Sequence, residues 1–577
     1  MTGQSIRPTQ FVLSYGVGSI VEAPGGPRVI LDFDKWGRVF VSGKTPSVDE
    51  FEITDSSASQ LLNKGRIFKI PTNLELNVSE AYPVFATGRF PKWSLCEKHD
   101  YLFQMSKTDG TNCPGCLQES GTGSARRQAI RFVRACPAGH LDDVDWHGMI
   151  HDSSVTCNCT VYEWRSQGSS LSNVIIYCPE CNGQVKLSDV YNRTKLCTGR
   201  FQERPSSPAS ACTATAQVTL RGSTSLRIPD IITTITIPRR STKLHRIFER
   251  IELRSIILSQ PKWTKQELID RLKYISEQDP NLVDPPVLDA VNESEESYIM
   301  QVIEDMRQAA KKQATTLEEI KLEEFRELKS AATHGYPADP TEQNPQFQIN
   351  KDDVRNDVKW NSLNLRVAPI ENLRVVMVQR GYHRLGSGAG LRRIDTFYDD
   401  GHNKWYPGVE QYGEGLFIDA GKSELKVADA DWMKICRSRS EVLCHPVFVW
   451  WHTLSHRIIS ALSLDSGYSS ASIRERVYID VDPVTGKASG GIVLYATQPG
   501  GDGSMGGLIA LVPQFERILE SAARNLNSCS NDPLCSEAKI SAGSSNGAAC
   551  YACLLLSETS CEHRNMYLDR NLLRGQP

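Results

Sequence analysis

The sequence contains no long hydrophobic run and no leader-like start. Its most apolar stretch, residues 447–464, is interrupted by two histidines, an arginine and several serines, whereas a membrane span needs about 20 largely apolar residues. The first ten residues have neither the basic nor the apolar region of a secretory signal. We therefore expect a cytoplasmic protein without a membrane partner, and we interpret 447–464 as a buried helix.

An excess of charge of one sign is also missing. The formal net charge is only −3 over 577 residues, whereas broad nucleic-acid-binding surfaces are usually basic. Any DNA-binding surface must therefore be local. Hydrophobic residues make up 40% and charged residues 23%, which is typical of globular proteins, and the length predicts three or four domains.

Complete catalytic motifs are absent as well. Residues 43–45 (GKT) resemble the end of a phosphate-binding loop, but Arg38 occupies the position of its first glycine. His452 and His456 are spaced as in a helical zinc-protease motif that lacks its glutamate. Residues 543–547 match G-x-S-x-G, but in a polar loop without the required strand-to-helix turn. We therefore expect no enzyme activity, and a metal-dependent nuclease or a protein-interaction scaffold without DNA contact remains the alternative.

Changes in composition divide the chain into five expected segments. Short β-type runs occur near the N-terminus and after residue 370, and apolar residues at three- and four-residue spacing mark a helical insert over 240–335. The fold class is α+β multidomain, a mixed β-rich core with zinc-ribbon-like modules. The segments are an N-terminal β-rich domain (1–90), a Cys/His-rich zinc-binding region (91–215), a β segment with the helical insert and a linker at 336–349 (216–349), an α/β core (350–510) and a C-terminal zinc-binding domain (511–577).

Cysteine, in contrast, is abundant and clustered. Of 17 cysteines, ten lie between Cys96 and Cys212 and five between Cys529 and Cys561. In a large cytoplasmic protein, such clusters more often bind metal than form disulfides. We expect two to four structural zinc ions as the cofactor.

Two of the cysteine sets have the short spacings of zinc knuckles. In each knuckle one tight turn brings two side chains to the same tetrahedral ion. The expected ligands are Cys96, His99, Cys113 and Cys116 in the first set and Cys529, Cys535, Cys550 and Cys553 in the C-terminal set. Cys561 is either an alternative ligand or a free thiol. Because four protein ligands leave no open position, we expect the zinc to be structural.

A further set between the two is less well defined by spacing. The knuckle of Cys178 and Cys181 is expected to share an ion with Cys197 and Cys212. The remaining candidates form a third site or exchange partners with this one, and they are Cys136, His140, Cys157 and Cys159.

Two places in the sequence are candidates for DNA contact. Gly503 and Ser504 lie in a glycine-rich loop before an expected helix, where backbone N–H groups can hold a phosphate; a tight turn is the alternative. The expected last helix (561–574) places cations and an aromatic ring on one face, which suits backbone contact and base stacking. Its candidate residues are His563, Arg564, Tyr567, Arg570 and Arg574. An amphipathic cap that packs on the zinc site is the alternative there.

An ordered series of motifs along the chain resembles a known family. The motifs include SYGVGSIVE (14–22), RFVRACPAGHLDDVDW (131–146), HTLSHRIISAL (452–462), GYSSASIRERVY (467–478), GDGSMGGL (501–508) and NGAACYACLLLSETSCEHRNMYLDR (546–570). Together they resemble the DrmB family of DISARM antiphage defence systems. The C-terminal part is also similar to the zinc-binding domain of the bacterial helicase MrfA, which implies zinc binding by the four clustered cysteines.

The resemblance implies a function that composition alone does not give. A DrmA-like helicase would supply the motor and form a heterodimer with this chain. The pair would bind DNA, single-stranded or with an overhang, during restriction of phage. No catalytic residue follows from the resemblance.

Overall fold

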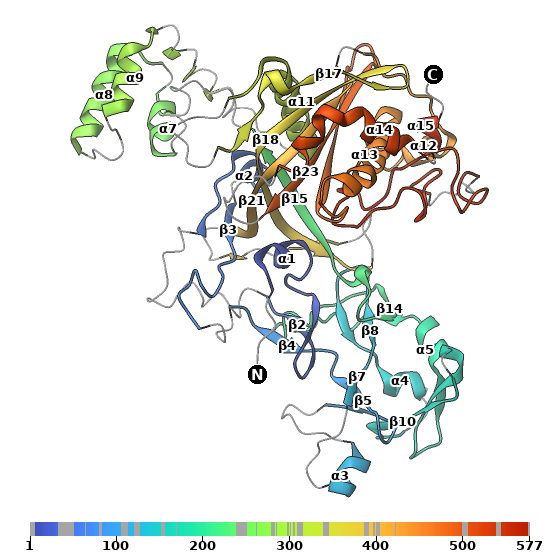
Figure 1. Cartoon of the computed structure of the whole chain (residues 1–577). Helices are drawn as coiled ribbons and strands as arrows, with labels where there is room; N and C mark the ends of the chain where they lie inside the picture. Colours follow the sequence, from blue (N-terminus) through green and yellow to red (C-terminus); the bar gives the residue numbers. More distant parts are fainter. Residues whose placement is uncertain are drawn as a thin grey trace. The chain divides into compact units, whose positions relative to one another are not determined.

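The computed structural model forms two compact units (Figure 1), made of residues 1–234 with 376–410 and of 235–375 with 411–577. The expected segments 216–349 and 350–510 are each shared between the two units. The described residues are 6–32, 51–63, 65–79, 84–105, 113–120, 127–151, 156–168, 170–237, 248, 251–260, 262–278, 283, 285–296, 299–300, 302–303, 306–307, 316–337, 345–385, 392–395, 398–399, 404–421, 423–498, 506–524, 526–537 and 544–574.

Unit 1 consists of short strands with a few short helices. Its helices are α1 (Pro8–Leu13), α2 (Ser56–Leu61), α3 (Pro114–Ser120), α4 (Trp146–Ile150) and α5 (Leu187–Asn192). Its strands are β1 (Ile20–Ala23), β2 (Gly26–Ile30), β3 (Arg66–Lys69), β4 (Thr87–Arg89), β5 (Trp93–Cys96), β6 (Tyr101–Gln104), β7 (Arg127–Ala129), β8 (Phe132–Ala135), β9 (Leu141–Asp143), β10 (Val161–Ser166), β11 (Val174–Tyr177), β12 (Gln184–Lys186), β13 (Lys195–Leu196), β14 (Thr215–Leu220), β15 (Ile228–Thr236), β19 (Ile394–Asp395) and β20 (Tyr398–Asp399).

Three separate small sheets organise the first 220 residues of unit 1. Their strand orders are β1-β2-β4, β12-β11-β10-β6-β5-β7 and β13-β14-β8-β9. A fourth arrangement pairs β15 with β18 (Leu363–His383), β18 with β21 (Lys404–Asp419) and β21 with β3. The six-stranded sheet and the four-stranded sheet determine which cysteines meet.

A buried arginine fastens the N-terminal loop of unit 1. The guanidinium of Arg384 donates to the carbonyls of Gly139 at 2.9 Å and Leu226 at 2.8 Å. It also pairs with Glu203 at 3.0 Å, and both side chains are almost fully buried. Gly18 belongs to the same site, because Arg384 also donates to its carbonyl oxygen at 3.3 Å. Its φ is +80°, and an added Cβ would lie 2.4 Å from the Tyr382 hydroxyl. The second glycine of the SYGVGS motif is therefore explained by close packing of the backbone against Tyr382.

Unit 2 is built on long antiparallel strands. Its helices are α7 (Ile251–Leu258), α8 (Lys265–Gln278), α9 (Pro285–Glu293), α11 (Leu317–His334), α12 (Asp431–Cys436), α13 (Pro446–Asp465), α14 (Phe515–Ala523) and α15 (Asn571–Arg574). Its further strands are β16 (Phe347–Gln348), β17 (Arg355–Trp360), β22 (Ile473–Val481) and β23 (Ala488–Gln498). The strand order is β18-β21-β23-β22, with β16 and β17 on β18.

Alternate residues of β22 face two different helices. Side chains along a strand point to opposite faces in turn. Glu475 contacts α13 through Ser455 and His456, whereas Arg476 pairs with Glu324 of α11 at 2.7 Å. The neighbouring strand follows the same rule with glycines, since a Cβ on Gly490 would meet Trp451 of α13 and one on Gly491 would meet Phe325 of α11. The sheet therefore lies between α13 and α11.

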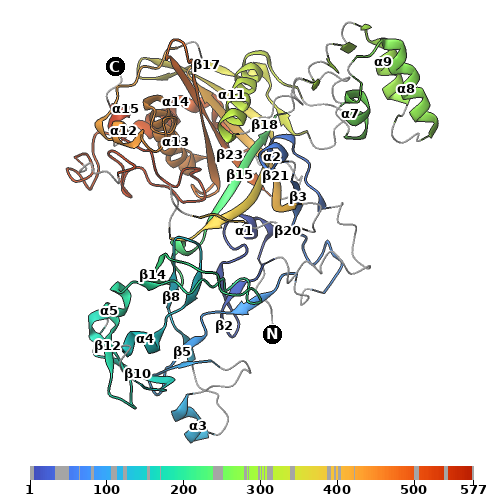
Figure 2. The ribbon, with the colours of Figure 1, turned by 180° about the vertical axis from the view of Figure 1, so that it is seen from behind.

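Helix α13 is buried along nearly its whole length. His445 caps its first turn by accepting a hydrogen bond from the Val447 N–H at 3.2 Å, and Pro446 occupies the first helical position. Figure 2 shows α12, α14 and α15 gathered around it. The predicted buried helix is therefore confirmed. Among the described residues, α13 included, no helix has both the length and the apolar character needed to cross a membrane.

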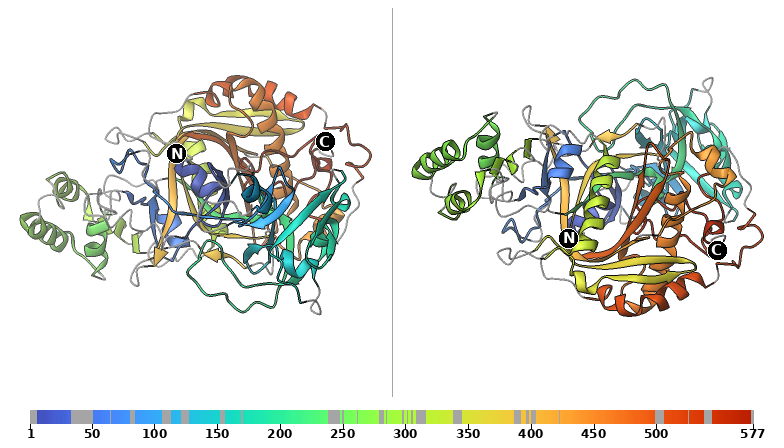
Figure 3. Two further views of the ribbon diagram at one scale, coloured as in Figure 1. Left: turned by 90° about the horizontal axis from the view of Figure 1, so that it is seen from below. Right: turned by 90° about the horizontal axis from the view of Figure 1, so that it is seen from above.

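The predicted helical insert is also present. Helices α7, α8 and α9 share a hydrophobic core of their own, which includes Leu253, Leu272 and Val287, and Figure 3 shows them gathered together in green. Helix α11 begins with a capping box between Thr316 and Glu319. At the ends of the expected linker 336–349, the backbones of Tyr336 and Ile349 exchange hydrogen bonds of 2.7 and 2.9 Å, and residues 338–344 between them lie outside the described residues.

Replacing Gly18 by alanine should destabilise unit 1. The added Cβ would collide with the Tyr382 hydroxyl. Gly25 is a matched control, since its φ is +93° and no described atom lies within 4 Å of an added Cβ. We expect Gly18→Ala to be less stable than Gly25→Ala by about 2 kcal/mol, the usual cost of overpacking, measured by urea unfolding with tryptophan fluorescence. Equal stability of the two variants would contradict this packing.

Candidate metal centres and the C-terminal segment

The first predicted set of ligands converges at the end of β5 and the start of α3. The Sγ atoms of Cys96 and Cys116 are 3.6 Å apart, and His99 Nδ1 lies 3.3 Å from Cys116 Sγ. Two thiolates about 2.3 Å from a tetrahedral zinc ion would lie about 3.8 Å apart, so the donors fit zinc. The other imidazole nitrogen, Nε2, faces Glu119 at 3.3 Å, a partner that orients a metal-binding histidine. Cys113 completes the set.

The predicted quartet of Cys178, Cys181, Cys197 and Cys212 does not form. The structure instead gives two complete sets, which are Cys136 with His140, Cys197 and Cys212, and His151 with Cys157, Cys178 and Cys181. The expectation that Cys136, His140 and Cys157 belong to an additional or exchanged site fits this arrangement, but Cys159 lies outside both sets. Its Sγ contacts the carbonyl oxygen of Val161 at 2.9 Å.

Sheet topology is the physical reason for the regrouping. The turn carrying Cys178 and Cys181 joins β11 and β12 of the six-stranded sheet. Cys197 follows β13, which belongs to the four-stranded sheet with β8, and β8 ends just before Cys136. Strand pairing therefore carries the two halves of the expected quartet to different sheets.

His151 is a candidate ligand that the sequence analysis missed. It follows α4, and its Nδ1 faces the carbonyl of His147 at 2.9 Å, which leaves Nε2 for the cluster. In the neighbouring set, His140 has the corresponding arrangement with the nitrogens exchanged, because Nδ1 faces Cys136 Sγ at 3.4 Å and Nε2 faces Ser210 Oγ at 2.9 Å. A histidine 27 residues before the CPEC knuckle has no spacing signal of its own.

The C-terminal set comes together as the spacing predicts. The distance between Sγ atoms is 3.4 Å for Cys529 and Cys550, and 3.7 Å for Cys535 and Cys553. These values again suit thiolates around a tetrahedral ion. Two free cysteines, Cys159 and Cys561, belong to none of these four cysteine-rich sets. Cys436 and Cys444 form a disulfide.

Backbone N–H groups prepare one thiolate in three of the sets. Burial opposes ionisation, but N–H groups two or three residues further on donate to the sulfur and lower the pKa of Cys96 to about 7. Backbone N–H groups at the same positions lower the pKa of Cys178 to about 6. For Cys550, the Cys529 thiol and a backbone N–H group together lower the pKa to about 7. In contrast, burial and neighbouring thiols raise the pKa of Cys116 to about 12. The remaining thiols therefore need a metal ion to be deprotonated together.

The predicted last helix does not extend over 561–574. Only α15 (Asn571–Arg574) is helical, and Arg564, Asn565 and Tyr567 have positive φ. The segment is instead fastened to residues 545–548, because the N–H of Tyr567 donates to Ser545 O at 2.8 Å and that of Arg570 donates to Ala548 O at 2.9 Å. The common face expected from the sequence spacing is therefore not formed.

Two of the residues expected on that face offer no free positive charge for a phosphate. The Arg570 side chain is 1% exposed and donates to Asp532 at 2.7 Å and to Leu526 O at 3.0 Å. Burial lowers the pKa of His563 to about 3, so the imidazole is neutral at neutral pH. Arg564, Tyr567 and Arg574 are only partly buried. Gly503 and Ser504 lie outside the described residues.

These features define a mixed α/β protein whose Cys/His clusters each supply four metal ligands. Residues 7–228 match a domain family of unknown function (DUF8724), and residues 454–554 match the MrfA Zn-binding domain. The second match covers the part of α13 from residue 454 onward and the C-terminal cysteine set. The predicted mixed α/β fold with a C-terminal four-cysteine cluster is therefore confirmed.

A relative is similar along nearly the whole chain. The DISARM protein DrmB of Bacillus paralicheniformis is 26% identical over 598 aligned positions, which cover 94% of this chain and 96% of that protein. The predicted resemblance to DrmB is thereby confirmed. Among solved structures, the crystal structure of the DUF1998 helicase MrfA bound to DNA is 11% identical, with a TM-score of 0.18 over 32% of this chain and 20% of that chain. A TM-score this low supports no conclusion about function.

The regrouped ligand sets predict which residues control zinc content. His151→Ala should remove about one zinc ion per chain, because one of four ligands is lost. Cys159→Ala is the matched control and should keep the wild-type content. Zinc would be measured by plasma mass spectrometry on purified full-length protein. Loss of zinc in Cys159→Ala but not in His151→Ala would contradict the grouping.

Arg570→Ala should destabilise unit 2 and loosen the four-cysteine set. The guanidinium contacts Asp532 and also lies beside Cys535, so its loss removes the most deeply buried cation next to these carboxylate and thiolate groups. We expect a loss of about 2 kcal/mol or more and faster transfer of zinc to a chromogenic chelator. Arg574→Ala, whose side chain is 23% exposed, should have the smaller effect. Equal zinc release from both variants would argue against this role of Arg570.

Proposed function

We propose that this chain is a non-catalytic, DNA-binding subunit that forms a heterodimer with a DrmA-like helicase in bacterial defence against phage DNA. The observation that carries the proposal is the similarity to the DISARM protein DrmB along nearly the full length of both chains. Similarity that extends over all segments favours a shared role of the whole protein, beyond a single shared domain.

The metal chemistry supports a role without catalysis. Catalytic zinc sites keep one position open for water or substrate. Each of the four cysteine-rich sets instead supplies four protein donors. Their zinc ions, four in number by this proposal, hold together the turns and strand ends that carry the ligands.

A DNA-binding surface on this chain has to be local. The net charge of −3 gives no general attraction to phosphates. Of the C-terminal candidates, Arg570 is buried in internal contacts and the His563 imidazole is neutral, whereas Arg564 and Arg574 are partly exposed cations and Tyr567 is a partly exposed ring. Arg574 lies on α15 and donates a hydrogen bond to the carbonyl oxygen of Leu526. Leu526 is three residues before Cys529 of the four-cysteine set.

The proposal predicts a stronger and more salt-dependent binding of DNA by the complex than by the helicase alone. Each added phosphate contact should steepen the slope of log affinity against log salt by about one. Fluorescence anisotropy with single-stranded, overhang and duplex DNA over a salt series measures both quantities. Arg574→Gln should reduce the slope, and Arg517→Gln is the control, because Arg517 is exposed and pairs with Asp465 on the surface.

Two outcomes would reject parts of the proposal. Equal affinity and slope with and without this chain would leave a scaffold that does not contact DNA. Cleavage of DNA by the purified chain with an added divalent metal, abolished by changing one acidic residue, would show an enzyme.

A further inference from the structure

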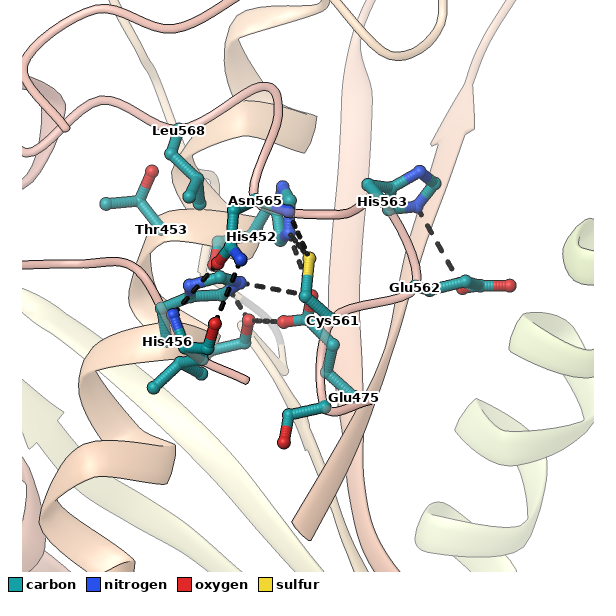
Figure 4. A network of polar contacts seen from close by, with 12 residues as sticks. His452, Thr453, His456, Glu475, Cys561, Glu562, His563, Asn565 and Leu568 are labelled. Atoms are coloured by element: carbon teal, nitrogen blue, oxygen red, sulfur yellow. Dashed lines mark hydrogen bonds and ion pairs between the residues drawn. The ribbon is translucent and has the colours of Figure 1, made fainter. Parts of the chain in front are cut away.

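A fifth cluster of metal-binding residue types lies in the interior of unit 2, apart from the cysteine-rich sets. Its members come from three elements and are all buried. They are His452 and His456 of α13, Glu475 of β22 and Cys561 of the C-terminal segment. Figure 4 shows their side chains turned toward one another. The four potential ligand atoms all lie within 4.8 Å of one another.

Each potential ligand atom of this cluster lies within 3.3 Å of another one. Glu475 Oε1 lies 2.8 Å from His452 Nε2 and 3.3 Å from His456 Nε2. Cys561 Sγ lies 3.2 Å from His452 Nε2. The histidines are four residues apart on α13 and therefore lie on the same face of the helix. The glutamate that the helix motif lacks is thus supplied by a strand.

Hydrogen bonds from outside the cluster fix the orientation of both imidazoles. His452 Nδ1 lies 3.2 Å from the carbonyl oxygen of Tyr567, and His456 Nδ1 lies 2.8 Å from that of Leu554. A carbonyl only accepts, so both Nδ1 atoms carry protons and donate. In neutral imidazoles the lone pairs are then on Nε2 and point into the cluster, as in metal-binding histidines held by carbonyl groups.

The other two groups are oriented in the same way. The Ser455 hydroxyl donates to Glu475 Oε2, which leaves Oε1 for the cluster. The Asn565 N–H donates to Cys561 Sγ at 3.2 Å. Each of the four side chains is therefore held by a contact from outside the cluster, with one potential ligand atom turned inward.

Protons alone satisfy this arrangement poorly. A single proton on His452 would pair with Glu475 and leave the His456 lone pair facing the same carboxylate oxygen. Protons on both imidazoles would bury two cations against one carboxylate, which is costly. One divalent ion, in contrast, accepts electron pairs from all four atoms at once.

We propose that His452, His456, Glu475 and Cys561 bind a divalent transition-metal ion, zinc by the chemistry of the donors. Two imidazoles, one carboxylate and one thiolate are ligand types that zinc takes in tetrahedral geometry. Because all four side chains are buried, the ion is structural and has no access to substrate. It cross-links α13, β22 and the C-terminal segment.

The proposed centre is next to the four-cysteine set without sharing a ligand with it. Leu554, whose carbonyl orients His456, directly follows the ligand Cys553. The backbone at residues 553–554 therefore contacts both centres, while each centre keeps its own four ligands.

Metal counting on the full-length chain tests this proposal. Native mass spectrometry should find five ions in the wild type and four in Cys561→Ala and His456→Gln, so each variant loses one ion per chain. Cys159→Ala is the matched control, because Cys159 is also buried but belongs to no cluster, and it should keep five. Variants with the same number of ions as the wild type would overturn the proposal.

A measurement on the wild type decides the question even where the variants fail to fold. Anomalous diffraction from crystals at the zinc absorption edge should show a peak within bonding distance of the four ligand atoms. Edge scans on the same crystals identify the element. Peaks at the four cysteine-rich sets with none at this cluster would show a hydrogen-bonded network filled by protons, and would reject the metal centre.

Discussion

Unit 2 depends on the need to satisfy the buried polar side chains of α13, a helix that is buried along nearly its whole length. His452, Thr453, Ser455 and His456 are all fully buried within α13, and buried polar groups need partners. Those partners come from β22 and from the end of the chain. Thr453 accepts from the N–H of Asp569, which in turn accepts from the indole of Trp432 on α12 at 2.8 Å. The C-terminal segment is therefore part of the core, and its irregular backbone follows from the positions of the groups that it has to reach.

The sequence predicted the parts of the metal sites that are local, and the reason is geometric. A C-x2-C knuckle is closed by its own turn, so Cys178 with Cys181 and Cys550 with Cys553 could be recognised from spacing alone. The partners of a knuckle depend on how strands pair. Cys197 joins Cys136 because β13 and β8 both pair with β14, and nothing in the spacing of the cysteines carries that information. His151 escaped notice for the same reason.

The C-terminal segment shows a second limit of sequence patterns. The 4-3-4 spacing of His563, Tyr567, Arg570 and Arg574 fits a helix face, but helical periodicity is a weak preference when other contacts compete. Here the backbone of the C-terminal segment hydrogen-bonds to the carbonyls of residues 545–548 and to polar groups of α13. It also lies next to a zinc-binding turn. The alternative weighed from the sequence, a segment packed on the zinc site, describes Arg570 better than an exposed contact does. The buried helix at 447–464, which has no such competitor, was predicted correctly.

The metal sites also bear on how this chain would meet DNA. Zinc with three thiolates and one imidazole carries a charge of −1, and zinc with four thiolates carries −2. The three mixed sets and the one all-cysteine set would therefore move the formal charge from −3 to about −8. A chain with that charge is repelled by phosphates at long range, so a few exposed cations would have to act at short range or beside a basic partner. Arg570 and Arg457, which lie against the four-cysteine set, are used to balance thiolates. Under the proposed function, the helicase would then supply most of the attraction for DNA, and this chain would shape how the strand is held.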